Sequence, residues 1–97
     1  MIRCAILGSS GLVSQTIQYL LENHPWFELV QVAGSEKKVG MNTSDLDWRL
    51  PHKRPQKNFT ILPLDEVKDV EIVFSALPSD VAAVWEEKLA KKGMTVF

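Results

Sequence analysis

Two glycines and a serine stand where an apolar run gives way to a helical pattern, and their spacing suits the binding of an anion. Gly8, Gly11 and Ser14 follow one another at intervals of three residues. In a strand–loop–helix context, the first glycine permits a tight turn and the second lets the backbone approach a phosphate. Free amides at the start of the helix would hold the anion, helped by the helix dipole. The alternative is that both glycines only shape a turn.

A second group of polar residues follows the next apolar run. Ser35 offers a hydroxyl, and Lys37 and Lys38 are cations that could hold the 2′-phosphate of NADP. Glu36 points weakly the other way, because an acid at this place binds the ribose 2′-hydroxyl of NAD. The pattern favours NADP over NAD, with a solvated charged turn as the alternative.

No residue of the chain fits the role of a catalytic acid, base or nucleophile. Cys4 lies inside a predicted strand and should be buried and inert. His24 and His52 have no partner at the spacing of metal ligands. We therefore expect neither a catalytic site nor a metal site within these residues.

The connection from Gly34 to Asn58 has no clear periodicity and is rich in cations. It holds six lysines and arginines against three acidic residues. A loop of this length in a compact domain is usually functional or mobile. Nucleic acid is a poor candidate ligand, because the basic stretch from Arg49 to Lys57 is short, is interrupted by prolines and has only Trp48 and Phe59 as flanking aromatic residues. We expect a solvated loop, or a lid over a cofactor or a substrate phosphate.

The elements that must position these residues can be predicted from hydrophobic periodicity. Apolar runs predict strands at residues 2–7, 28–34, 59–62, 71–76 and 94–97. A first helix should begin after Gly11 and end near Asn23, with an apolar stripe of Val13, Ile17, Leu20 and Leu21. A second helix is expected over residues 80–92, before Gly93, with its inward side made of Val81, Val84, Trp85 and Leu89.

Strands that alternate with helices indicate an α/β fold with a parallel sheet. The expected architecture is a Rossmann-type doubly wound parallel sheet of strand order 3-2-1-4-5, with ligands at the carboxyl ends of strands one, two and four. The last strand stops at residue 97. We therefore expect residues 1–97 to be an incomplete dinucleotide-binding domain, truncated at strand five, without a catalytic or dimerisation domain. An open sheet edge would favour a homo-oligomer.

Composition narrows the class of protein further. Ninety-seven residues make one domain at most, and a net charge of −1 exerts no general pull toward nucleic acid or an anionic membrane. A single cysteine cannot form an internal disulfide, and no signal or membrane-spanning segment is visible. We expect a cytoplasmic protein.

Three segments resemble a known family. CAILGSSGLVSQ is similar to the glycine loop of aspartate-semialdehyde dehydrogenases, usually GATGxVGQ. LLENHPWFELVQVAGSEKKVG resembles the helix, HP-x-FEL strand and polar loop that follow, and DVEIVFSALPSDVAAVWEEKLAKKGMTVF resembles the archaeal and fungal branch. The likeness covers nearly the whole chain and is weaker in residues 41–62.

The resemblance implies NADP-dependent reductive dephosphorylation of aspartyl phosphate to aspartate semialdehyde, a step of lysine, threonine and methionine synthesis. The family's nucleophilic cysteine and histidine base would come beyond position 97, so the chain should be inactive alone and meet a substrate only within a full-length parent. By resemblance, Ser10, Gly11, Leu12 and Val13 would line the pyrophosphate, Ser35 and Lys37 would face the 2′-phosphate, and Ser75, Ala76, Leu77 and Pro78 would border the ribose and nicotinamide. Together with Gly8, Ser9 and Lys38, these are the expected cofactor-binding residues.

Other interpretations stay open. Malonyl-CoA reductase shares the N-terminal pattern, and a non-enzymatic NADP-binding regulatory module could carry a similar loop. N-acetyl-glutamyl-phosphate reductase is disfavoured, because its usual His-Gly is here Ser79-Asp80. A fragment that folds but binds nothing is a further alternative.

Overall fold

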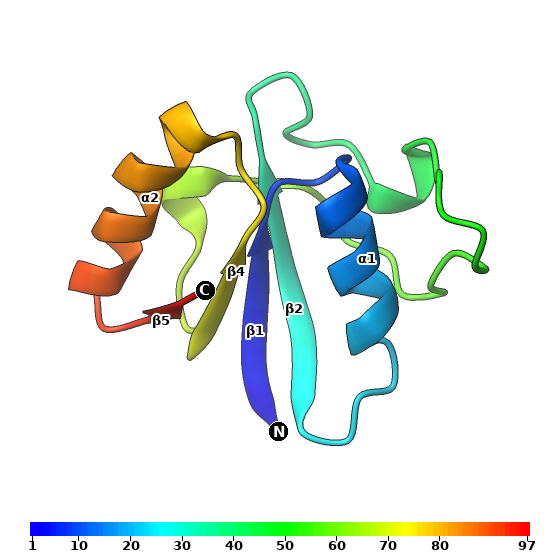
Figure 1. Cartoon of the computed structure of the whole chain (residues 1–97), viewed down its shortest axis with the longest axis horizontal. Coiled ribbons are helices and arrows are strands. Elements are labelled where there is room, and N and C mark those ends of the chain that lie inside the picture. The colour runs from blue at the N-terminus through cyan, green and yellow to red at the C-terminus, as the bar shows by residue number, and fades with distance from the viewer.

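A computed structural model describes residues 1–97 and contains one parallel sheet of order β3-β2-β1-β4-β5 (Figure 1). The strands are β1 (Ile2–Leu7), β2 (Phe27–Gly34), β3 (Leu62–Pro63), β4 (Ile72–Ser75) and β5 (Thr95–Val96). Every neighbouring pair is parallel. The predicted Rossmann-type architecture and strand order are confirmed.

The central strand, β1, is the most deeply buried element. Its residues from Cys4 to Leu7 have no exposed surface. It pairs with β2 on one side and β4 on the other, so that Leu7 lies opposite both Ala33 and Ser75. A strand covered on both faces must be apolar nearly throughout, which explains the run IRCAIL.

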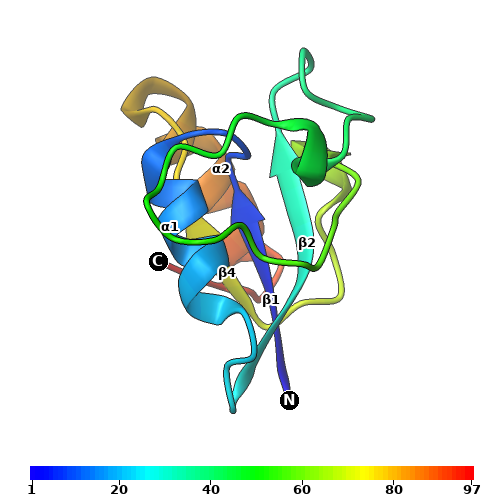
Figure 2. The same cartoon turned by 90° about the vertical axis from the view of Figure 1, so that its right-hand side faces the viewer.

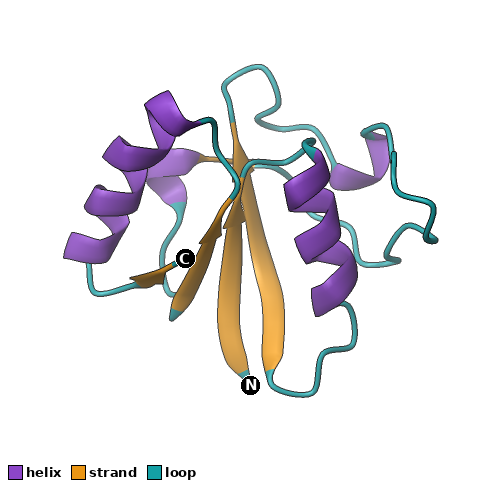
Figure 3. Cartoon of the chain, in the orientation of Figure 1, coloured by secondary structure: helices purple, strands orange, loops and turns teal.

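Helices cover the two faces of the sheet (Figure 3). Helix α1 (Leu12–Leu21) contributes Leu21 to a cluster with Ile6, Leu29 and Val32. Helix α2 (Ser79–Lys91) contributes Leu89 to the opposite cluster, which also contains Val67, beside the short helix η2 (Leu64–Glu66). Opposite placement follows because the right-handed crossovers β1-α1-β2 and β4-α2-β5 run in opposite directions along the sheet.

The predicted apolar stripe of α1 is partly wrong. Val13 and Leu20 are each 61% exposed, whereas Ser14, Gln15 and Gln18 are buried together with Leu21. The buried face is polar because it meets backbone carbonyls of two loops rather than only the sheet, as described below. In α2, Leu89 is buried as predicted, but Val84 is 51% exposed.

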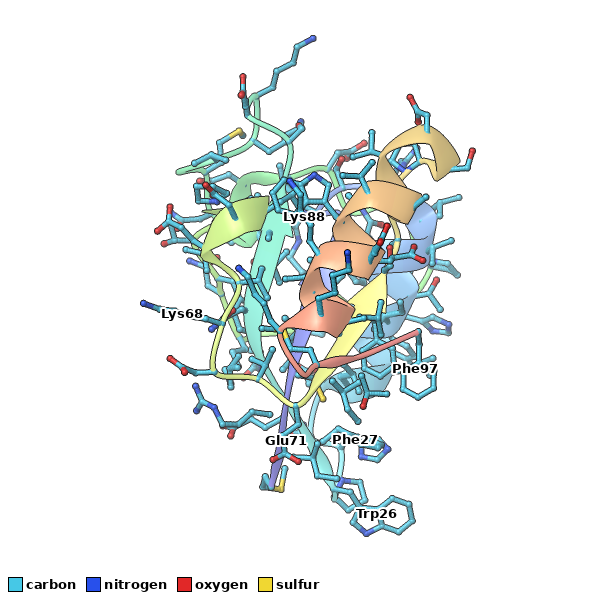
Figure 4. The ribbon with its side chains drawn as sticks, turned by 90° about the vertical axis from the view of Figure 1, so that its left-hand side faces the viewer. Trp26, Phe27, Lys68, Glu71, Lys88 and Phe97 are labelled. Carbon is cyan, nitrogen blue, oxygen red and sulfur yellow. The ribbon has the colours of Figure 1, made fainter.

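Strand boundaries also differ from the prediction, by one residue at the start of β2 and by one residue at each end of β4. The third strand forms at Leu62–Pro63 instead of residues 59–62, and Thr60 makes an isolated antiparallel bridge with Asn42. The fifth strand is limited to Thr95–Val96. Phe97 follows it and is 68% exposed (Figure 4). Its ring stacks on that of Phe74 at a centroid distance of 5.9 Å.

The long connection between β2 and β3 is attached to α1. It contains the short helix η1 (Thr43–Asp45) and then passes across α1 (Figure 2). The ring of Tyr19 stacks on His52 at 4.3 Å, and the Glu22 carboxylate accepts a hydrogen bond from the Gln56 amide at 2.7 Å. The helices of the structure are all too short or too polar to cross a membrane.

Candidate nucleotide site

The glycine loop lies where the chain reverses direction across the sheet, between β1 and β4. Gly8 has φ +100°, and a Cβ there would stand 2.9 Å from the carbonyl oxygen of Ala76, at the end of β4. Only glycine satisfies both the left-handed backbone and this close approach. In sheets of this kind, ligands bind in the crevice at such a switch point.

The start of α1 presents backbone amides with no side-chain cap. Gly11 is the N-cap residue, it makes no side-chain capping bond, and the first turn contains no acidic residue. A Cβ at Gly11 would meet no heavy atom within 4 Å, so the space beside it is open. Leu12 and Val13 follow and are exposed. Uncapped first-turn amides beside open space are an arrangement that can bind a phosphate.

Ser14 occupies the third position of the glycine pattern and has a structural role there. Its hydroxyl donates to the carbonyl of Gly8 at 2.6 Å and accepts from the Gln18 amide nitrogen at 3.1 Å. Gln18 also donates to the carbonyl of Ser9 at 3.3 Å. These bonds fix the loop onto the helix. Polar residues at 14, 15 and 18, which share one helical face, were the signal that could have revealed this.

The residues expected to meet the 2′-phosphate lie in the turn after β2. Gly34 packs against Ser9, since a Cβ there would stand 2.9 Å from the Ser9 hydroxyl. The backbone carbonyl of Ser35 accepts from the amide of Lys38 at 2.9 Å, which closes the turn. Ser35 and Lys37 are exposed, whereas Lys38 is half-buried. The glycine loop and this turn are thus adjacent.

The residues after β4 lie on the other side of the glycine loop. The amide of Ala76 donates to the carbonyl of Leu7 at 2.8 Å. The Ser75 hydroxyl is buried and has no hydrogen-bond partner. Leu77 packs against the core, and Pro78 is the N-cap residue of α2. An unpaired buried hydroxyl is costly, so Ser75 retains a donor and an acceptor for a group that reaches this edge.

Gln15 and Arg49 belong to this region and were not predicted. Gln15 is 2% exposed, and its amide nitrogen donates to the carbonyls of Ser10 at 3.2 Å and Asp47 at 2.7 Å. The Arg49 guanidinium also donates to the Ser10 carbonyl, at 3.1 Å. The contacts to Asp47 and of Arg49 join residues more than thirty positions apart through a loop without periodicity, which is why sequence patterns did not reveal them.

Two hollows flank α1. The larger, about 630 Å³, lies near the start of β2, away from the carboxyl ends of the strands, between the end of α1 and residues 53–57. The smaller, about 240 Å³, is lined by Ser10, Lys38, Leu46, Asp47 and Arg49. The smaller hollow touches the glycine loop and the turn after β2, so it is the one that belongs to the candidate site.

Comparison with known proteins identifies the domain. Residues 3–97 match the family model described as semialdehyde dehydrogenase, NAD binding domain. The chain belongs to this family. The family is one of nucleotide-binding domains. In this chain the glycine loop, the turn after β2 and the end of β4 lie at one edge of the sheet, formed by the carboxyl ends of the parallel strands.

Individual relatives agree with the family. The aspartate-semialdehyde dehydrogenase of Archaeoglobus fulgidus is 40% identical over 95 residues, which are 94% of this chain and 28% of that protein. Malonyl CoA reductase (NADP) of Metallosphaera sedula is 33% identical over 98% of this chain and 28% of its own length. The crystal structure of aspartate semialdehyde dehydrogenase with NADP from Candida albicans superposes with a TM-score of 0.91 and 25% identity, over 99% of this chain and 28% of that one. The chain therefore spans little more than a quarter of the relatives it matches.

Proposed function

We propose that this domain binds NADP for an aspartate-semialdehyde dehydrogenase, the enzyme that converts aspartyl phosphate to aspartate semialdehyde by reductive dephosphorylation. The observation that carries the proposal is the uncapped start of α1 beside Gly11, open on the side where a Cβ would have no neighbour. NADP as the cofactor is supported by the Candida albicans enzyme, whose structure contains it, and by the Metallosphaera sedula relative, whose name includes it.

In this proposal the domain binds and orients the nucleotide and does not perform the acid–base or nucleophilic steps. The amides that follow Gly11 would hold the pyrophosphate, and the cations after β2 would meet the 2′-phosphate. The buried Ser75 hydroxyl would gain a partner from the ribose or nicotinamide end. When bound, NADP supplies the hydride. The catalytic cysteine and histidine would come from residues outside this chain, so we expect the 97 residues to have no dehydrogenase activity alone.

The direct test is a calorimetric titration of the purified chain with NADP and, separately, with NAD. We expect saturable binding of NADP and weaker binding of NAD. Gly11→Ala is the informative variant, because its Cβ would enter the open space while Gly11 itself has an ordinary φ of −70°. It should weaken NADP binding by about tenfold or more, since a crowded phosphate loses one or more charge-assisted bonds.

The control for this titration is a test that Gly11→Ala remains folded. Far-ultraviolet circular dichroism and urea unfolding should show Gly11→Ala to be nearly as stable as the unaltered chain, because glycine and alanine at an N-cap differ by only about 1 kcal/mol. A folded chain that gives no heat with either nucleotide would contradict the proposal, and its glycine loop would then be only a turn.

A further inference from the structure

The smaller hollow is lined in part by Arg49, a cationic residue that the sequence following β2 would not suggest as part of the site. Its lining includes Lys38 from the turn after β2 and Arg49 from the connection that crosses α1. Lys37, the neighbouring cation in the sequence, is exposed and is not part of this lining. Asp47 supplies the one negative charge of the hollow. The two cations therefore outnumber the acid at its surface.

Arg49 is held in this place through both its backbone and its side chain. Its amide donates to the Gln15 side-chain oxygen at 2.9 Å, and its Nη2 donates to the Ser10 carbonyl at 3.1 Å. A guanidinium has five N–H donors in a fixed plane, so most of them remain free for another group. The free donors and the Lys38 ammonium belong to residues that line the same small hollow.

Gln15 is the residue that makes this placement rigid. Its side chain is buried and uses both of its functional atoms, donating to Ser10 and Asp47 and accepting from Arg49. It thereby joins the glycine loop to residues 47–49. Arg49 is consequently fixed relative to the loop that would hold the pyrophosphate, instead of moving with a free surface loop.

We propose that Arg49, together with Lys38, binds the 2′-phosphate of NADP and sets the preference for NADP over NAD, and that Gln15 is its positioning residue. The inference rests on the proposed function and adds a residue to the same site. The adenosine ribose of a bound dinucleotide lies between the glycine loop and the end of the second strand, which is where the hollow is. A planar guanidinium matches a phosphate bidentately, and a 2′-hydroxyl would gain much less from it. Asp47 opposes the phosphate and limits the preference.

The experiment measures the dissociation constants of NADP, NAD and the probe 2′,5′-ADP for the chain and its variants. Arg49→Met should weaken NADP and 2′,5′-ADP by about 10- to 100-fold and change NAD by less than about twofold, because only charge-assisted bonds to the phosphate are lost. The NADP affinity of Arg49→Lys should lie between that of the unaltered chain and that of Arg49→Met. Lys53→Met removes the same charge from the same connection, outside the hollow, and should change the NADP/NAD ratio by less than about twofold through screened charge alone. Asp47→Asn should strengthen NADP several-fold.

The role of Gln15 is tested by the ratio of NADP to NAD affinity and not by the free energy of unfolding. Gln15→Met should lower the NADP/NAD preference in the unaltered background, and it should have no further effect on that ratio in an Arg49→Met background. Circular dichroism at each temperature used ensures that only folded variants are compared.

The outcomes separate the two proposals. If Arg49→Met weakens NADP and NAD equally, or leaves NADP unchanged while Lys38→Met or Lys37→Met alters it, the role given to Arg49 is wrong and the proposed function stands. If the unaltered folded chain binds no NADP, the proposed function fails and this inference fails with it.

Discussion

The hydroxyl of Ser14 donates a hydrogen bond of 2.6 Å to the carbonyl oxygen of Gly8, across the turn that joins β1 to α1. The third position of the glycine pattern is usually glycine because the helix must approach the strand closely. Here the side chain is fully buried and turns that approach into a bond. Serine can therefore take the place of glycine at this position. The first-turn amides of α1 remain without a side-chain cap.

Ser14→Ala should destabilise the domain by about 1–2 kcal/mol, because it removes the two hydrogen bonds of the hydroxyl and leaves the partly buried Gly8 carbonyl and the buried Gln18 amide less satisfied. Urea unfolding followed by circular dichroism measures this. Thr16→Ala is the matched control: it removes a hydroxyl from the same helix, but this one is exposed and bonds to the Leu12 carbonyl. Its effect should stay within about 0.5 kcal/mol. If both variants lose the same free energy of unfolding, the hydrogen bond of Ser14 stabilises the domain no more than that of Thr16.

Gly8→Ala should be much more harmful than Gly40→Ala. Both glycines have positive φ, +100° and +87°, so each substitution introduces backbone strain of about 1 kcal/mol or more. Only at Gly8 would the new Cβ also overlap the Ala76 carbonyl, at 2.9 Å, since nothing lies within 4 Å at Gly40. The difference between their free energies of unfolding isolates the contact between the ends of β1 and β4. If the two variants are equally stable, that contact is not close in solution.

The positions of β1, β2, β4 and both helices could be predicted because apolar runs and punctuating glycines or prolines determine them locally. Helix α1 shows the limit. Its buried polar face depends on carbonyls of Ser9, Ser10 and Asp47, and no periodicity reveals which distant backbone groups a glutamine will meet.

The third strand was displaced because Thr60 pairs with Asn42, so that parallel pairing starts only at Leu62. Arg49 was missed for the same reason as Gln15.

Cys4 should react slowly with a thiol reagent while the domain is folded. It has no exposed surface, and burial, with a smaller effect of the Glu71 charge, raises the pKa of its thiol. Labelling must wait for opening of the sheet, so the rate should be on the order of 10³-fold below that in denaturant, where the thiol is free. Ellman's reagent reports this directly, because Cys4 is the only cysteine. Rapid labelling without denaturant would show that β1 opens easily.

The same raised pKa predicts a loss of stability at alkaline pH. Between the lower pKa of the unfolded thiol, about 8.5, and the raised pKa in the folded domain, the folded state binds more protons than the unfolded state. The free energy of unfolding should therefore fall as the pH rises through that window. Comparing Cys4→Ala with the unaltered chain at pH 7 and pH 10 isolates this contribution, since the variant should lack it. Parallel pH dependences would contradict the assignment.

The edge strand β5 should promote self-association. It pairs with β4 on one side, and Phe97 beside it is 68% exposed. An unprotected edge offers backbone groups to another chain, and a lysine on such an edge discourages pairing. Sedimentation velocity over a range of concentrations should show Thr95→Lys to be more monomeric than the unaltered chain. Thr16→Lys, on the exposed side of α1, is the control for added charge. Identical sedimentation of all three would exclude β5 as the contact.

The segment that crosses α1 is attached to it at Gln15, Tyr19 and Glu22 by contacts within the chain alone. Its order is therefore acquired during folding, and the conformational entropy of these residues is already lost when a nucleotide arrives. We expect association to need no loop closure, so that diffusion and the charges of Arg49 and Lys38 set its rate. Differences in affinity between nucleotides would then arise mainly from how slowly each one dissociates.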